Sequence, residues 1–255
     1  MAEHDPLSLL FHQLASIDYL QGYDFEMLSP GDEGSGRPFA LHPRDKTLRK
    51  AENILRLLPP DLSGERVLDI GCNKGFFSFE CVRRNAREVL GLETIPAIVE
   101  VLQTISKASP IFDGARFECR GFSTALAAEG PFDTILFCSS YHYVYAELRS
   151  HEAIFATLAR LQPKRVILEL PLETDDAFAW NHLTEQLQGE QLKAYNVHAI
   201  LHAASLSFGS VRYIANSGFL RTRDIFLLEV PGASNPYRYE WEQADRSALW
   251  SRVRP

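Results

Sequence analysis

The stretch VLDIGCNKGFFSFE, residues 67–80, decides the fold. An apolar run passes through Asp69 and is followed by two glycines four residues apart, Gly71 and Gly75. Gly71 permits a tight turn, and Gly75 allows a close approach of the backbone where a helix begins. Asn73, between them, tolerates a positive φ better than most residues. Free backbone amides at such a helix start bind anions or carboxylates, so the stretch predicts a strand, a ligand-binding turn and a helix.

Short apolar runs alternate with helical patterns along the chain. The expected strands are 66–70, 88–93, 115–120, 132–138 and 165–170, and the expected helices lie near 76–85, 96–108, 123–129 and 147–161. This alternation predicts a parallel sheet with crossovers on both faces. Residues 196–230 indicate a helix, a strand, a tight turn and a strand, so the last pair is antiparallel. The predicted fold is α/β, a Rossmann-like doubly wound seven-stranded sheet, mostly parallel with a final antiparallel strand.

The remaining segments set the expected organisation. Leucines and alanines at helical spacing predict a helix over 44–58, which Pro59 and Pro60 end. The glycine- and proline-rich loop 28–38 marks the segment before it as irregular. The expected parts are an irregular N-terminal extension and lid at 1–43, a main domain at 44–231 with an acceptor-side insertion at 171–195, and a C-terminal tail at 232–255.

The composition is typical of a globular chain. With 255 residues, 45% of them hydrophobic, the chain is long enough for one large domain with a sizeable core. A net charge of −7 argues against nucleic acid as the main partner, because phosphate binding needs a basic surface. Neither an apolar run of about 20 residues nor a signal peptide is found, so no membrane span is expected. The cysteines, Cys72, Cys81, Cys119 and Cys138, form no CxxC pair, which predicts buried reduced thiols and a cytoplasmic location.

Two classes of ligand are excluded at the turn, because the stretch lacks the glycine motifs that they require. A nucleoside triphosphate site needs GxxxxGK(S/T), but Lys74 precedes its glycine and Phe76 follows it. A dinucleotide site needs GxGxxG, whereas the spacing here is GxxxG. A nucleoside with a short polar tail fits, because Glu93 ends the second strand, where a ribose-binding acid belongs in such folds. The alternative is a plain turn beside an ordinary strand-end carboxylate.

The stretch 67–80, together with GLE at 91–93, resembles the first two motifs of class I S-adenosylmethionine-dependent methyltransferases. The resemblance covers about residues 60–230 and implies S-adenosyl-L-methionine as the cofactor. It implies a cofactor site made of Asp69, Gly71, Cys72, Asn73, Gly75, Phe76, Glu93, Ile95, Gly121, Phe122 and Cys138. Two departures stand out. Asn73 replaces the middle glycine of the motif, and the acid that often binds the adenine amino group is absent from CRGFSTAL, residues 119–126.

The methyl acceptor is expected beside FCSSYHYVYAEL, residues 137–148. The Asn/Asp-Pro-Pro-Tyr/Phe motif of amino-methylating relatives has no match there, which favours a hydroxyl acceptor. His142 is the candidate general base, since imidazole removes protons at neutral pH; the alternative is a histidine that only packs in an aromatic layer. The candidate acceptor-binding residues are Tyr141, Tyr143, Glu173 and Trp180. No histidine pair supports a metal among the acids of 173–176, so none is expected.

A narrower resemblance suggests the acceptor class. GFFS, YHYV, VILEL and DDAFAW, in this order, resemble the methyltransferase domain that caps bacterial O-antigen polysaccharides, whose acceptor is a sugar or sugar phosphate. A looser likeness is to enzymes that alkylate wobble uridine in tRNA. The basic side chains of helix 44–58, Arg44, Lys46, Arg49, Lys50 and Arg56, would meet phosphate on either substrate or simply face solvent. The rival from another class is a catalytically silent binding subunit. The oligomeric state is left open.

Overall fold

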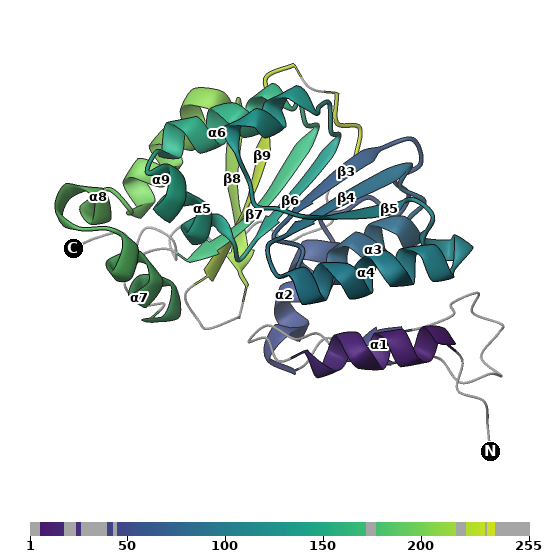
Figure 1. The fold of residues 1–255 in the computed structure, drawn as a ribbon. Helices are drawn as coiled ribbons and strands as arrows, with labels where there is room; N and C mark the ends of the chain where they lie inside the picture. The colour runs from purple at the N-terminus through teal and green to yellow at the C-terminus, as the bar shows by residue number, and fades with distance from the viewer. Residues whose placement is uncertain are drawn as a thin grey trace.

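The computed structural model describes residues 6–17, 24–26, 40–42, 45–171, 177–217, 223–232 and 234–237. Its centre is a seven-stranded sheet of order β5-β4-β3-β6-β7-β9-β8 (Figure 1). The strands are β3 Arg66–Ile70, β4 Glu88–Glu93, β5 Ala115–Cys119, β6 Thr134–Cys138, β7 Arg165–Pro171, β8 Ser210–Asn216 and β9 Arg223–Glu229. All neighbours are parallel except β9, which runs antiparallel to both β7 and β8. The predicted fold class is confirmed.

Helices cover both faces of this sheet (Figure 1). On one face lie α2 Asp45–Leu55, α3 Phe76–Arg83 and α4 Pro96–Ala108, and on the other α5 Tyr141–Leu148, α6 His151–Arg160 and α9 Val197–Ser207. The middle strands are buried on both faces, which explains why they are nearly continuous apolar runs. No helix in the part of the chain that the structure describes is long and apolar enough to cross a membrane.

Two predicted helices are corrected. The helix expected over 147–161 is two helices, α5 and α6, because Arg149 takes a left-handed conformation with φ 56° and ends α5. Ser150 then caps α6, its hydroxyl accepting from the amide of Ala153 at 3.1 Å. The helix expected over 123–129 is a short 3₁₀ turn, Thr124–Ala128. The aromatic run YHYVY gave no helical signal, although its side chains pack α5 against the core.

The N-terminal extension is not irregular throughout. Helix α1, Pro6–Ser16, packs Phe11 edge-on against Phe79 and Phe112, with ring centroids 6.0 and 6.1 Å apart. Strands β1 Asp24–Glu26 and β2 Ala40–His42 pair antiparallel. The sequence missed α1 because it is short and separated from the main pattern. The loop 28–38 lies outside the described residues, so its role as a lid stays a prediction.

The insertion contains two helices, α7 Ala177–Gln186 and α8 Gly189–Lys193. Leu183 and Leu187 are buried against the helices α5, α6 and α9, and the hydroxyl of Tyr195 donates to the carbonyl of Pro171 at 2.9 Å. Glu173 and the side chain of Trp180 lie outside what the structure describes, so their predicted roles in acceptor binding stay predictions. The acids at 175 and 176 lie outside it as well.

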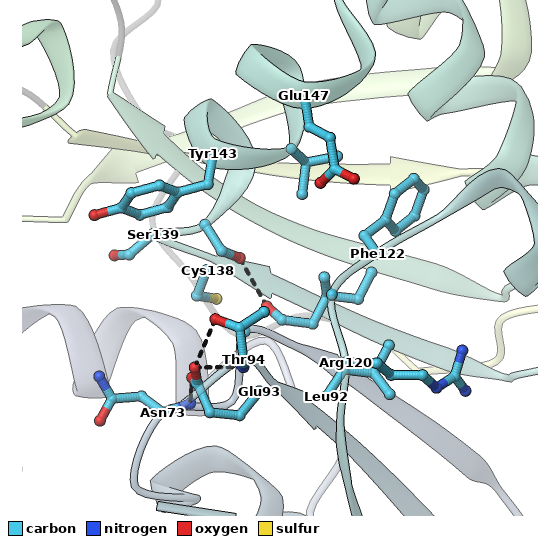
Figure 2. Close-up of a pocket in the computed structure, with 15 residues that line it drawn as sticks. Asn73, Leu92, Glu93, Thr94, Arg120, Phe122, Cys138, Ser139, Tyr143 and Glu147 are labelled. Carbon is cyan, nitrogen blue, oxygen red and sulfur yellow. Dashed lines mark hydrogen bonds between the residues drawn. The ribbon is translucent and has the colours of Figure 1, made fainter. Parts of the chain in front are cut away.

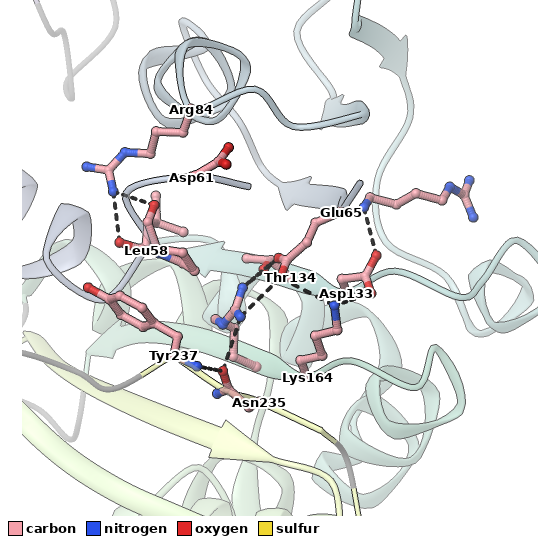
Figure 3. A network of polar contacts seen from close by, with 12 residues as sticks. Leu58, Asp61, Glu65, Arg84, Asp133, Thr134, Lys164, Asn235 and Tyr237 are labelled. Atoms are coloured by element: carbon pink, nitrogen blue, oxygen red, sulfur yellow. Dashed lines mark hydrogen bonds and ion pairs between the residues drawn. The ribbon is translucent and has the colours of Figure 1, made fainter. Parts of the chain in front are cut away.

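A buried ionic network lies at the amino ends of β3, β6 and β7 (Figure 3). Arg165, 1% exposed, donates to Glu65 at 2.6 Å and to the hydroxyl of Thr134. Its other terminal nitrogen donates to the Asn235 side chain at 3.2 Å. The network joins three strands to residues 234–237, the part of the C-terminal tail that the structure describes.

Candidate active site

A cleft opens at the carboxyl ends of β3, β4, β5 and β6 (Figure 2). Ligands bind at this edge in open α/β sheets. The residues that line the cleft are Ile70, Gly71, Asn73, Leu92, Glu93, Thr94, Arg120, Gly121, Phe122, Cys138, Ser139, Ser140, Tyr143, Val144 and Glu147. Seven predicted site residues are therefore brought together there, namely Gly71, Asn73, Glu93, Gly121, Phe122, Cys138 and Tyr143.

The turn between β3 and α3 has the conformation that its sequence predicts. Gly71, Asn73 and Gly75 have φ values of 70°, 50° and 76°, all in the left-handed region. A side chain at Gly71 would also collide with Ser140, because a Cβ there would lie 2.6 Å from Ser140 Cβ and Oγ. A Cβ at Gly75 would lie 2.9 Å from Leu102 Cδ2. The lack of a side chain at Gly71 therefore leaves room beside Ser140 in the cleft, and the lack of one at Gly75 lets α3 pack on α4.

The expectation of free amides at this turn is wrong for residues 72–75. The amide of Cys72 donates to the carbonyl of Leu92, and that of Gly75 to the carbonyl of Cys72, both at 2.9 Å. The amide of Lys74 donates to Asn73 Oδ1 at 2.6 Å. The amides of residues 72–75 are thus all occupied by the turn itself or by β4, so a ligand must be recognised here by side chains and by amides outside this segment.

Glu93 is fixed at the mouth of the turn. Its Oε1 accepts from the amide of Thr94 at 2.7 Å, and its Oε2 accepts from the amide of Asn73 at 2.9 Å (Figure 2). Oε1 also accepts from the amide of Ile95 at 3.1 Å. The side chain is buried, yet it lines the cleft. A carboxylate has about four acceptor positions, so Oε2 keeps one position for a ligand hydroxyl. A pre-oriented acceptor of this kind suits a ribose diol.

Asp69 lies behind the turn rather than in the cleft lining. Burial raises its pKa to about 6, opposed by the hydrogen bond from the Ser78 hydroxyl and reinforced by the charge of Glu93. Ser78 Oγ donates to Asp69 Oδ2 at 2.6 Å. The backbone around Cys72, Gly75, Phe76 and Ile95 likewise shapes the site from outside its lining, and their direct cofactor contacts stay predictions.

Tyr141 is a core residue, which corrects its assignment to the acceptor site. Its side chain is fully buried, and its hydroxyl is hydrogen-bonded to His151 Nδ1 at 2.7 Å. The ring also lies near Phe137 and Tyr195 in the core beneath α5 and α6. Tyr143, two residues on, lines the cleft as predicted, because successive positions of α5 face different sides.

His142 is buried beside the cleft and does not line it. Its ring centroid lies 4.1 Å from that of Tyr143 and 6.0 Å from that of His182 on α7. Burial, followed by the charge of Arg223 and by His182, holds the pKa of His142 well below its usual value. The neutral ring agrees with the packing alternative, and the assignment of His142 as a general base stays a prediction.

The buried imidazole should make the fold sensitive to acid. Because the folded pKa of His142 is depressed, its contribution to stability is complete above about pH 6.5 and is lost as pH falls below that value. Asp69 works in the opposite direction, since its raised pKa adds stability below about pH 6. We expect the stability penalty of His142→Gln, measured by urea unfolding, to be smaller at pH 5 than at pH 7.5. The exposed His202→Gln on α9 is the control, and an equal penalty for His142→Gln at both pH values would contradict the prediction.

A buried ionic group supports the cleft from below. Lys50 Nζ donates to Ser139 Oγ at 2.6 Å and lies 3.4 Å from Glu169 Oε2, and the Ser139 hydroxyl donates to that same oxygen at 2.6 Å. Ser139 has a left-handed φ of 61°. Burial acts to raise the pKa of Glu169, but the charges of Lys50 and Arg223 and the hydroxyl bonds lower it overall. Lys50 is 3% exposed, so it is not part of a solvent-facing or phosphate-binding basic surface.

Sequence reasoning missed several residues of the cleft, including Ser139, Ser140, Val144 and Glu147 on α5 and just before it. The positions from Ser140 to Glu147 recur at helical spacing and would have been found if α5 had been predicted. Nothing in the sequence marks Ser139 or its buried partners. Of the four cysteines, all are free, and Cys119 is exposed where burial was expected.

The comparisons with known proteins agree with this geometry. A family model described as a methyltransferase domain matches residues 42–207, and the chain belongs to this family. The match confirms the resemblance to methyltransferases that the stretch 67–80 carried. No curated protein matches the sequence.

Solved structures with the same fold share little sequence with this chain. WbdD has a TM-score of 0.54 at 19% identity over 93% of this chain and 52% of its own length. Another structure of WbdD is described as that of a bifunctional kinase–methyltransferase. EvdMO1 has a TM-score of 0.52 at 15% identity over 89% of this chain and 48% of its own. The [4+2]-cyclase SpnF has a TM-score of 0.50 at 11% identity over 72% of this chain and 80% of its own. The chain spans about half the length of WbdD and EvdMO1, and these likenesses show the fold alone.

Proposed function

We propose that the protein transfers the methyl group of S-adenosyl-L-methionine to a hydroxyl oxygen of a sugar, a sugar phosphate or another small acceptor. The observation that carries the proposal is the Glu93 carboxylate, which three backbone amides orient at the mouth of the turn with one acceptor position left. The left-handed turn at Gly71 and the family of the chain support the same donor. The resemblance of GFFS, YHYV, VILEL and DDAFAW to the polysaccharide-capping methyltransferase domain supports a glycan-like acceptor.

Different residues of the cleft bind different parts of the donor. Glu93 binds the ribose diol, and Gly121 and Phe122 border the adenine, while Gly71 leaves room for the methionine moiety beside Ser140. The sulfonium of the donor supplies the leaving group. The protein aligns donor and acceptor, and this alignment accelerates the transfer far more than any single contact does. Tyr143 and Ser139 also line the cleft, and in this proposal they border the side where the acceptor approaches.

The donor is tested by calorimetry with S-adenosylmethionine and S-adenosylhomocysteine. We expect both ligands to bind. Glu93→Ala should weaken the binding of both by about 10- to 100-fold, because the ribose loses a charge-assisted acceptor and the turn loses the hydrogen bond between Glu93 and the amide of Asn73. Glu88→Ala, at the other end of β4, is the matched control and should bind normally. Unchanged affinity in Glu93→Ala would remove Glu93 from the site, and tight NAD binding by the unmodified protein would overturn the proposed donor.

The acceptor is tested by incubation of the protein with labelled donor and fractions of cell extract. Label in a small or glycan fraction supports the proposal, and label in tRNA favours the wobble-uridine alternative. Donor binding without transfer to any fraction favours a silent binding subunit.

A further inference from the structure

The hydroxyl of Ser139 is a polar group of the cleft whose hydrogen-bonding role is fixed by its charged neighbours. Ser139 directly follows β6, lines the cleft and is buried. Lys50 Nζ, from α2, donates to Ser139 Oγ at 2.6 Å, and Oγ donates to Glu169 Oε2, from β7, at 2.6 Å. An ammonium can only donate and an ionised carboxylate can only accept. The single hydrogen of the Ser139 hydroxyl is therefore committed to Glu169.

The ionised state of Glu169 is what fixes this direction. Burial acts to raise its pKa, but the charges of Lys50 and Arg223 hold the pKa below its usual value, so the carboxylate is ionised at neutral pH. A serine oxygen has two lone pairs, and Lys50 occupies one of them. No other donor among the described residues reaches Ser139 Oγ. Ser139 therefore keeps one acceptor position and no donor for a ligand in the cleft.

The backbone holds the Ser139 hydroxyl in this place. Ser139 has a φ of 61°, and its amide donates to the carbonyl of Glu169 at 2.8 Å. Left-handed conformations are uncommon outside glycine and cluster at functional sites. Packing alone does not explain the ionic partners either, because apolar residues of similar size often stabilise a core as well as a buried ion pair does. The conformation and the ion pair together orient one hydroxyl of the cleft.

Ser139 lies toward the end of the cleft where the methyl group is transferred in the proposed function. Figure 2 shows the hydroxyls of Ser139 and Tyr143 on one side of the view and Phe122 and Arg120 on the other. The proposed function puts the adenine beside Phe122, so the methyl group and its acceptor belong on the side of Ser139.

We propose that Ser139 accepts a hydrogen bond from the hydroxyl that is methylated, and so selects a protonated acceptor oxygen over an ionised one. The inference rests on the proposed function, because it assumes methyl transfer in this cleft. With its hydrogen directed at Ser139, the acceptor oxygen turns its lone pairs elsewhere in the cleft, where the methyl group lies. An ionised phosphate or carboxylate oxygen has no hydrogen to donate and would meet the lone pair of Ser139. Lys50 and Glu169 are positioning residues, which act through Ser139.

The test measures methyl transfer and donor binding in the same variants. Ser139→Gly removes the hydroxyl and suits a φ of 61°, whereas Ser139→Ala removes it and strains the backbone. Ser205→Ala is the control, because Ser205 is exposed on α9 and its hydroxyl donates to the carbonyl of His202. The substrates are labelled S-adenosylmethionine and the extract fraction that the unmodified protein labels most. Calorimetry with S-adenosylhomocysteine measures donor affinity, and circular dichroism checks folding.

We expect Ser139→Gly and Ser139→Ala to lower the initial rate of transfer by about 10- to 100-fold, because the acceptor loses the bond that orients it. Ser139→Gly should bind S-adenosylhomocysteine as tightly as the unmodified protein, and Ser205→Ala should match that protein in both measurements. A full rate of transfer in Ser139→Gly would overturn the role of Ser139 while the proposed function stands. A rate that falls only in proportion to a loss of donor affinity would also overturn it.

The chemical nature of the product tests the selectivity. NMR of an isotope-labelled methyl group distinguishes a methyl ether from a methyl ester, a methyl phosphate and a methyl amine. We expect a methyl ether. A methyl ester or methyl phosphate would show that the acceptor oxygen is ionised and would overturn the selectivity assigned to Ser139. A methyl amine, or donor binding with no transfer to any fraction, would overturn the proposed function and this inference together.

Discussion

Lys50→Met should lower the free energy of unfolding by about 3–5 kcal/mol, the cost of breaking a buried ion pair by removing one partner. Lys50 holds both Ser139 and Glu169 and is almost fully buried. Without it, the Glu169 carboxylate stays buried with less compensation, and Ser139 loses the contact that supports its left-handed backbone. Urea unfolding followed by circular dichroism measures the change. A loss of this size is a large fraction of the stability of a typical domain.

Arg49→Met is the matched control for this experiment, because Arg49 precedes Lys50 on α2 and is exposed. It should change the free energy of unfolding by less than about 0.5 kcal/mol. The double variant Lys50→Met/Glu169→Gln should recover part of the loss, since it removes the unpaired charge as well. A Lys50→Met protein as stable as Arg49→Met would show that the buried ionic group is not structural.

Gly71→Ala should weaken S-adenosylhomocysteine by at least about 100-fold. An alanine at a φ of 70° costs about 1–2 kcal/mol, and its Cβ would lie 2.6 Å from Ser140. Ser140 must then move, which breaks the bond from its hydroxyl to the carbonyl of Ile70 at 2.8 Å. Both residues line the cleft, so the donor pocket is deformed as well as strained. Calorimetry measures the affinity.

Gly64→Ala separates the two parts of this effect. Gly64 also has a positive φ, of 81°, but no heavy atom lies within 4 Å of a Cβ there, and it lies at the amino end of β3. It should lose stability of the same order as the backbone strain at Gly71 and bind the donor normally. If Gly71→Ala retained full affinity, the turn would not be part of the donor pocket.

The sheet could be predicted because its strands are short, apolar and regularly interrupted. The helical spacing of residues 96–108 and the glycine stretch gave elements that agree with the structure within a few residues. Glu93 was found because the carboxyl end of a parallel strand is a fixed position in the fold. These features depend on local pattern and on one rule of topology.

The rest of the site depends on contacts that the sequence does not show. Tertiary packing of Tyr141 and Tyr145 makes YHYVYAEL a helix, which local pattern did not indicate. Lys50 lies 89 residues from Ser139 and 119 from Glu169 in the sequence, so their pairing could not be inferred from spacing. The self-satisfied amides at residues 72–75 follow from side-chain and strand contacts that only the folded turn contains.

The position of β9 has a consequence for how the chain is made. Among the residues that the structure describes, β9 is the last strand in chain order but lies between β7 and β8 in the sheet, and β8 pairs with the sheet only through it. During synthesis, β8 therefore leaves the ribosome with no strand to join until residue 229 has followed it. Until then β7 has an open edge, which is a site for pairing with other chains. Aggregation during expression should thus be greatest for chains stopped between residues 217 and 229, and shortening the delay between β8 and β9 should reduce it.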